Sequence, residues 1–243
     1  MYLYNSFFLS LTLSFSFFQH AIAQGTVSIS IISAQPSGAS QLISPSFAGF
    51  GIESSNVFSF TGADSANTLS INLLNNLANY TGTPPHLRIG GNTQDYILYR
   101  DSYNDFAVGR NLNPVGQGAN PADLFYIGPK FFQVLDRFPG NMPITCGLSL
   151  AYSQSDYIEQ ITSMAKAAQT GLSNLNLVSF EIGNEPDLYL QNGFRTGTWD
   201  GSAYTQEWLS RAAAVYSGVL QPVGIGNNFF EPACTASTAG SSF

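Results

Sequence analysis

Val178-Ser179-Phe180-Glu181-Ile182-Gly183-Asn184-Glu185-Pro186-Asp187-Leu188 is the stretch of sequence that decides the fold. Residues 175–182 are largely apolar and β-branched or aromatic, which favours a buried strand. That pattern stops at Gly183, and Pro186 has no N–H group to donate to a central strand. Glu185 is therefore expected at the point where a buried strand opens into a loop.

A carboxyl group at such an apolar rim has its charged form disfavoured by desolvation. This is the condition for a general acid that works near neutral pH. The alternative interpretation is a simple turn, in which Asn184-Glu185-Pro186 carries only a solvated glutamate. The pattern of strands and helices in the rest of the chain favours the catalytic interpretation.

The remainder of the chain alternates predicted strands with predicted helices. Further strands are expected at residues 47–53, 86–91 and 142–150, and a fifth begins within residues 228–232. Apolar spacing and helix-start signals predict helices over residues 63–80, 120–138 with a break at Gly128-Pro129, 157–171 after Asp156 as N-cap, and 202–219. Residues 96–118 are predicted to form a long polar loop.

Strands that alternate with helices imply a parallel sheet, so the predicted fold class is α/β. A doubly wound open sheet and a (β/α)8 TIM barrel both fit this pattern. No glycine-rich phosphate-binding loop follows the first predicted strand, which counts against a nucleotide-binding α/β protein. The sequence therefore favours the barrel, with the site at the carboxyl ends of its strands.

The composition indicates a protein surface with few charges. Only 9% of the residues are charged, and 14% are aromatic; soluble proteins average about 25% charged residues. The net charge of −7 argues against a nucleic acid as partner. This composition suits a secreted protein that faces carbohydrate.

Residues 1–23 are predicted to form a signal peptide. Residues 7–18 are an apolar run, Ala21-Ile22-Ala23 provides a cleavage pattern, and no later segment has transmembrane character. The mature protein is accordingly expected to be secreted and extracellular, without membrane contact after cleavage. Asn79-Tyr80-Thr81 is a sequon for N-glycosylation at Asn79, expected near the end of a surface helix.

The cysteines and histidines indicate no metal site. Cys146 and Cys234 leave a disulfide open, because two cysteines in a long chain do not make a disulfide framework. His20 and His86 lie far apart, and nothing in the sequence has the spacing of metal ligands. Neither a metal ion nor an organic cofactor is expected.

Two motifs carry a resemblance to a known family. The stretch from Phe180 to Asp187, with Leu87-Arg88-Ile89-Gly90-Gly91-Asn92-Thr93 upstream, resembles glycoside hydrolase family 79. This family contains retaining β-glucuronidases and relatives of heparanase that fold as barrels. The resemblance covers residues 26–230 and implies a secreted enzyme that cleaves β-glucuronides, with a glucuronide-containing glycan or glycoside as its partner.

The resemblance also implies roles for individual residues. Glu185 matches the general acid/base, and Asn184 matches the residue that hydrogen-bonds the 2-hydroxyl of the sugar. Glu53 resembles an acidic residue that holds sugar hydroxyls, and Asn92 and Asp95 lie in a loop that lines the same subsite. The alternatives are a solvated strand end for Glu53 and ordinary turn chemistry for Asn92 and Asp95.

Arg88 is expected to point into the mouth of the barrel. A buried arginine needs a carboxylate, so pairing with Glu53 or Glu185 is predicted.

The sequence departs from the family pattern at the second catalytic carboxylate. Family members carry the nucleophilic glutamate at the end of a later strand, followed by a β-sandwich domain, so the nucleophile is expected beyond Phe243. Residues 37–243 are assigned to a partial barrel with about four βα units, and residues 24–36 to a strand of the missing sandwich. Glu231 does not resemble the nucleophile, and the isolated chain is expected to be inactive.

Two further functions stay open from the sequence alone. The same machinery would serve a neutral sugar such as a xyloside or arabinoside, because the Asn-Glu-Pro motif does not distinguish these substrates. A secreted protein that binds glycans without cleaving them is the other alternative, and the missing nucleophile favours it.

Overall fold

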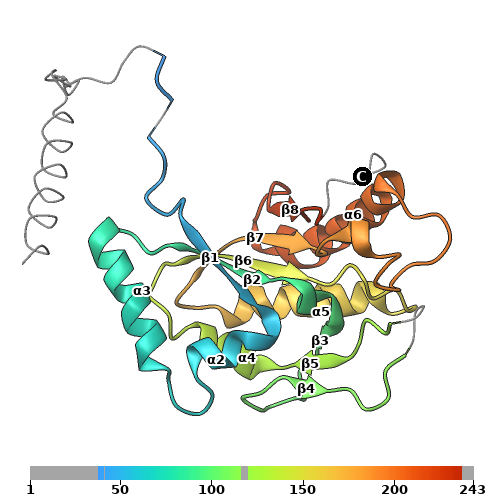
Figure 1. Ribbon diagram of the computed structural model, residues 1–243, viewed down its shortest axis with the longest axis horizontal. Coiled ribbons are helices and arrows are strands. Elements are labelled where there is room, and N and C mark those ends of the chain that lie inside the picture. The colour runs from blue at the N-terminus through green and yellow to red at the C-terminus, as the bar shows by residue number, and fades with distance from the viewer. Residues whose placement is uncertain (1–37, 41, 116–119, 237–243) are drawn as a thin grey trace, which may run out of the picture. The chain divides into compact units, whose positions relative to one another are not determined.

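The computed structural model describes residues 38–40, 42–115 and 120–236 of the 243-residue chain. The chain divides into two units, Met1–Leu42 and Ile43–Phe243, and the second unit contains the helices and strands below (Figure 1). The predicted signal peptide at residues 1–23 and the strand predicted within residues 24–36 lie outside the described residues.

A parallel sheet forms the centre of the second unit. Among the described residues its strands occur in the order β1 (Gly49–Glu53), β2 (His86–Gly90), β6 (Pro143–Leu148), β7 (Asn176–Ile182) and β8 (Phe230–Pro232). Every neighbouring pair is parallel, and the five strands predicted from the sequence are confirmed. The spatial order follows the chain order, whereas a doubly wound sheet reverses direction at a switch point. The sheet therefore has the arrangement of a partial barrel.

Helices connect the successive strands of this sheet. They are α2 (Val57–Thr61), α3 (Thr68–Thr81), α4 (Pro129–Leu135), α5 (Tyr157–Gly171) and α6 (Gly201–Val215). Figure 1 shows α2, α4 and α5 along one side of the strands. Right-handed crossovers between consecutive parallel strands place their helices on one face, as a barrel requires.

The start of one helix and the N-terminal cap of another differ from the sequence-based prediction. The helix predicted from residue 63 begins at Thr68, because Gly62 has a φ of 83° and the Asn67 side chain accepts a hydrogen bond from the Ser70 N–H. Asp156 precedes α5 as predicted, but its carboxylate does not cap the helix; it accepts from the Tyr152 hydroxyl at 2.9 Å and from the Gln160 amide at 2.7 Å.

The connection between β2 and α4 was predicted incorrectly. A helix was expected from residue 120, but Phe125–Ile127 forms β5, which pairs in parallel with β3 (Ile97–Tyr99) and antiparallel with β4 (Gly109–Arg110). The predicted long loop therefore contains two strands of a small second sheet. Its pairing joins segments that are distant in the chain, so no local pattern reveals it.

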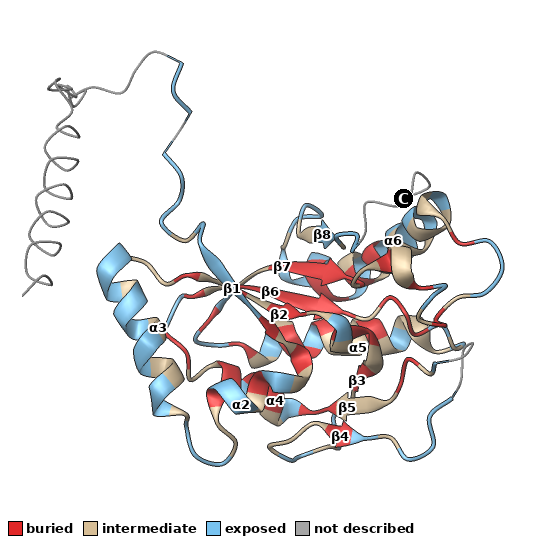
Figure 2. Cartoon of the chain, viewed as in Figure 1, coloured by how far each residue is buried: buried red, intermediate tan, exposed pale blue. Residues whose placement is uncertain are grey.

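The core lies on the helix-covered face of the main sheet. Alternate residues of the three central strands point to this face and are buried: Leu87, Ile89, Ile144, Cys146, Leu148, Phe180 and Ile182. Phe131 and Phe132 of α4 are buried in the same apolar cluster. Figure 2 shows the buried residues concentrated in these strands and in the adjoining sides of the helices. The opposite face of the strands carries glycines and polar side chains.

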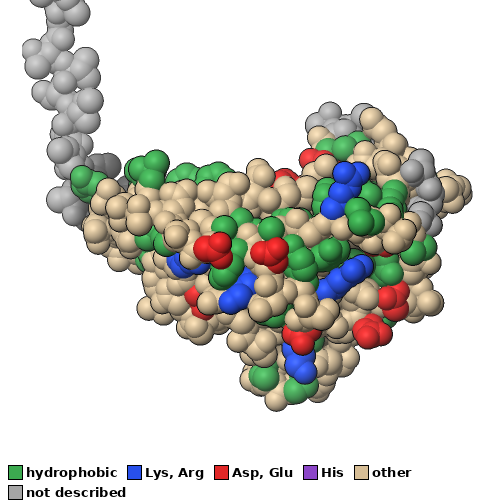
Figure 3. Space-filling model, turned by 90° about the horizontal axis from the view of Figure 1, so that it is seen from below, with side chains coloured by type: hydrophobic (Ala, Val, Ile, Leu, Met, Phe, Trp, Pro, Cys, Tyr) green, Lys and Arg blue, Asp and Glu red, His purple; other side chains and the backbone are tan. Residues whose placement is uncertain are grey.

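The surface has the uncharged character that the composition predicts. On the face shown in Figure 3, a few acidic and basic side chains are interleaved among uncharged ones. Within the described residues, none of the helices has both the length and the apolar character needed to cross a bilayer. Cys146 is buried and Cys234 exposed, and neither forms a disulfide. Asn79 is exposed on the last turns of α3, the expected location.

Candidate active site

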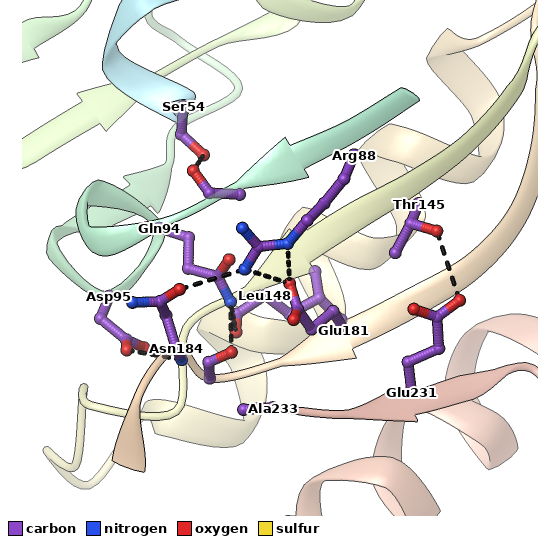
Figure 4. A network of polar contacts seen from close by, with 12 residues as sticks. Ser54, Arg88, Gln94, Asp95, Thr145, Leu148, Glu181, Asn184, Glu231 and Ala233 are labelled. Atoms are coloured by element: carbon purple, nitrogen blue, oxygen red, sulfur yellow. Dashed lines mark hydrogen bonds and ion pairs between the residues drawn. The ribbon is translucent and has the colours of Figure 1, made fainter. Parts of the chain in front are cut away.

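The candidate site begins on the polar face of the sheet. Strand register places Arg88 beside Thr145, and Glu181 between Gly147 and Glu231. Figure 4 shows Arg88, Glu181 and Glu231 on the same side of the strands. Because parallel strands end at one edge of a sheet, the residues that follow β1, β2 and β7 gather at the carboxyl end of this face. Glu53, the loop from Asn92 and the Asn184-Glu185 pair all lie at this edge.

The turn after β7 presents Glu185. Gly183 has a φ of 84° and packs against the Leu150 side chain. Glu185 itself lies in the left-handed region, with φ 49° and ψ 56°, and precedes the short helix η4 (Pro186–Leu188). A non-glycine residue in this region costs roughly 1–3 kcal/mol and persists where the surroundings impose it, often at functional sites. Glu185 is half-buried, and its carboxylate has no hydrogen-bond partner among the described residues.

The buried carboxylate of Asp95 fixes this turn through hydrogen bonds. Its Oδ2 accepts hydrogen bonds from the Asn184 N–H at 2.9 Å and the Tyr189 hydroxyl at 2.6 Å. Its Oδ1 accepts from the Leu150 and Ala151 N–H groups at 2.9 and 3.2 Å. Burial raises the pKa of the Asp95 carboxyl above its ordinary value, and these hydrogen bonds oppose the rise.

Asp95 therefore has a structural role. The residue is 1% exposed, and all of its acceptor positions are occupied by protein donors. The prediction that Asp95 contacts substrate is wrong, because the carboxylate is buried and bonded to protein donors. The sequence could not reveal this, since a local pattern does not show that the loops after β6 and β7 converge on one carboxylate.

Arg88 bridges Asn184 and Glu181, a carboxylate that the sequence motifs do not point to. Its Nε and Nη2 both lie 2.6 Å from Glu181 Oε2, and Nη2 also donates to Asn184 Oδ1 at 3.0 Å (Figure 4). The predicted pairing of Arg88 with Glu53 or Glu185 is wrong. The sequence feature that indicates this pairing is Glu181, an acidic residue inside the otherwise apolar strand β7, because a buried charge needs a partner.

Burial raises the pKa of Glu181, while the hydrogen bond and charge of Arg88 oppose the rise; Glu231 and Asp95 raise it further. The Glu181 side chain is 7% exposed and that of Arg88 is 37% exposed.

Glu53, at the end of β1, contacts the loop that contains Asn92. The Glu53 carboxylate accepts a hydrogen bond from the Thr93 N–H and lies directly against Gly91, where a Cβ atom would overlap it. Asn92, which begins the short helix η3 (Asn92–Tyr96), is exposed. Their predicted contacts with a sugar stay predictions.

Gln94 also belongs to this region, although no sequence motif points to it. Its Nε2 donates to the carbonyl oxygens of Gly183 at 2.8 Å and Leu148 at 3.4 Å. Its Oε1 is buried against Gly90 and Gly147, and a Cβ atom at either glycine would overlap it. The sequence feature that indicates this contact is Gly147 inside β6, because a glycine within a strand often marks the close approach of another group.

Glu231 lies at the end of a hydrogen-bond chain across the sheet. His86 Nε2 is 2.8 Å from Thr145 Oγ1, which is 2.7 Å from Ser179 Oγ. Ser179 donates to Glu231 Oε1 at 2.5 Å. Protein groups therefore hold this carboxylate, as they hold Glu181. The described residues contain no group of three or more His, Cys, Asp or Glu side chains arranged to hold a metal ion.

Comparison with known proteins finds relatives among fungal glycosidases. The chain is 30% identical over 190 residues to a β-glucuronidase of Neurospora crassa, a region that covers 76% of this chain and 34% of that protein. It is 32% identical over 206 residues to a β-glucuronidase of Aspergillus niger, covering 83% and 38%.

A solved structure shows the same fold. It is the 4-O-α-L-rhamnosyl-β-D-glucuronidase of Fusarium oxysporum 12S in complex with Rha-GlcA, with a TM-score of 0.56 and 24% identity, covering 75% of this chain and 37% of that one. No protein-family model matches the chain. The chain spans about a third of the length of these relatives. It is thus homologous, over that third, to the fungal β-glucuronidases of glycoside hydrolase family 79.

Proposed function

We propose that this chain supplies the acid/base side of a retaining β-glucuronidase site and acts in a secreted protein. Glu185 protonates the glycosidic oxygen and later removes a proton from the attacking water. Asn184 donates to the 2-hydroxyl of the sugar, and Glu53 and Asn92 line the same subsite. The family relationship covers about a third of the length of the relatives, and the activity and the substrate are what the proposal adds to it.

The observation that carries the proposal is the backbone at Glu185. A left-handed non-glycine residue lies in the turn that follows a buried strand, and its neighbour Asn184 is anchored at both its N–H group and its side chain. This backbone conformation costs conformational free energy, yet it leaves the Glu185 carboxylate without a hydrogen-bond partner among the described residues. A carboxylate held this way is available to a ligand.

Retention requires a second carboxylate about 5 Å from the first. Glu181 and Glu231, on the polar face of the sheet, both accept hydrogen bonds from protein donors. No described residue is therefore proposed as the nucleophile. The same observation favours one alternative function, namely a protein that binds glucuronides and does not cleave them.

The test uses the protein expressed from its own transcript and a panel of aryl β-glucuronides, xylosides and arabinosides. Glu185→Gln should lower kcat on the β-glucuronide by roughly 10²–10⁴. Glu159→Gln is the matched control, because Glu159 is exposed on α5 and should leave the rate unchanged.

Three other outcomes oppose the proposal in distinct ways. Glucuronide binding without turnover supports the binding alternative, and a preference for a xyloside or arabinoside assigns a neutral sugar. Equal rates for wild type and Glu185→Gln would remove Glu185 from the mechanism.

A further inference from the structure

The orientation of the Asn184 side chain depends on one bridging guanidinium. The Asn184 amide oxygen accepts from Arg88 Nη2 at 3.0 Å, and the backbone N–H of the same residue donates to Asp95 at 2.9 Å. With the oxygen occupied, the group left for a ligand is the Nδ2 amide group, which has no hydrogen-bond partner among the described residues. In this orientation Asn184 presents its N–H donors to a ligand, while its amide oxygen faces Arg88.

Arg88 needs an anchor of its own to impose that orientation. Its side chain starts on β2, reaches past β6 and meets Glu181 on β7. Glu181 Oε2 accepts from both Nε and Nη2 at 2.6 Å, which fixes the plane of the guanidinium as well as its position. The buried carboxylate is held inside the strand, three residues before Asn184. Figure 4 shows the guanidinium between the Glu181 carboxylate and the Asn184 amide.

We propose that Glu181 is a positioning residue, which acts through Arg88 to keep the Asn184 amide turned with its N–H groups toward the sugar. The inference rests on the proposed function, since it explains how the site recognises a 2-hydroxyl by donation. Glu181 does not touch the substrate. Its loss leaves the guanidinium free to turn and the Asn184 amide free to flip.

The first experiment needs no catalytic activity. In uniformly ¹⁵N-labelled protein, Arg88 should give an ordered, slowly exchanging Nε–H signal, and Asn184 an ordered pair of side-chain NH₂ signals. Glu181→Gln should shift the Arg88 signal upfield and broaden or split the Asn184 pair, because the charged acceptor is gone. Arg88→Lys and Asn184→Ala assign the signals. Unchanged Asn184 signals in Glu181→Gln would overturn the proposal.

The second experiment uses the reaction as readout. The ratio of kcat/KM for an aryl β-glucuronide to that for its 2-deoxy counterpart should fall roughly tenfold in Glu181→Gln. The fall should vanish in an Asn184→Ala background, because both changes remove the same contact. A merely structural role lowers both rates equally and adds to Asn184→Ala, which contradicts the proposal. Glu159→Gln again serves as the control.

A second variant and a readout that does not need activity separate a failure of folding from a failure of the proposal. If Glu181→Gln does not fold, Arg88→Lys replaces it; lysine keeps a positive charge beside Glu181 but cannot hold two acceptors in one plane. It should also disorder the Asn184 signals, and ordered signals in it count against the proposal. A protein that hydrolyses neither substrate overturns the proposed function, and the positioning claim is then decided by the NMR signals alone.

Discussion

Asp95 and Glu185 are two acidic residues near one sheet edge whose carboxylates have opposite surroundings. Asp95 is 1% exposed and accepts four hydrogen bonds from the loops after β6 and β7 and from Tyr189. Glu185 accepts none at its carboxylate from the described residues. Whether a carboxylate serves the fold or a ligand therefore depends on its neighbours and not on its residue type.

Asp95→Asn should destabilise the protein strongly. The amide would place an NH₂ group against N–H and O–H donors, so the free energy of unfolding should fall by about 2–4 kcal/mol. Urea unfolding followed by circular dichroism measures the change. Asp64→Asn, at an exposed position, is the matched control and should stay within about 0.5 kcal/mol of wild type. Equal unfolding curves for the two variants would show that Asp95 does not fasten the loops.

At the scale of the elements, β6 separates the two strands that Arg88 and Glu181 occupy. Its polar face carries Gly147, and the Gln94 side chain fills the space that a Cβ atom would need. From there Gln94 bonds the carbonyl oxygens of Gly183 and Leu148, at the ends of β7 and β6. The glycine therefore lets one side chain tie the ends of two strands together.

Gly147→Ala should lower the free energy of unfolding by about 1–3 kcal/mol, because the new methyl group overlaps Gln94. Gly51→Ala, on the same face of β1 with open space around it, should be neutral or stabilising by roughly 0.5–1 kcal/mol. Combining Gly147→Ala with Gln94→Ala should give less than the sum of the two losses. Additive losses would mean that the overlap is not the cause.

At the scale of the whole second unit, β1 is an edge strand with exposed apolar side chains. Phe50 on β1 is 50% exposed and Phe47 just before it is 78% exposed. Nearby in the chain, α3 leaves Leu69 and Leu73 exposed at 68% and 55%. An uncovered edge with apolar groups is a template for pairing with another chain.

The isolated chain is accordingly expected to self-associate as its concentration rises. Phe50→Lys should reduce this association, because a lysine on an edge strand opposes edge-to-edge pairing. Multi-angle light scattering over a concentration series provides the measurement. Leu112→Lys is the control, since Leu112 is 82% exposed but lies in the connection between β4 and β5 of the second sheet. An equal reduction by both variants would indicate a general effect of charge.

The sequence by itself determined the alternation of strands and helices, the parallel order of the main sheet and the place of Glu185 after a buried strand. These features depend on periodicity and turn residues, which are local along the chain. Only the tertiary structure decided that Arg88 pairs with Glu181, 93 positions away, that Asp95 is a structural carboxylate and that β3 pairs with β5. The reason is that the interaction energy of two charged groups depends on their distance in space, and local sequence patterns carry no information about that distance.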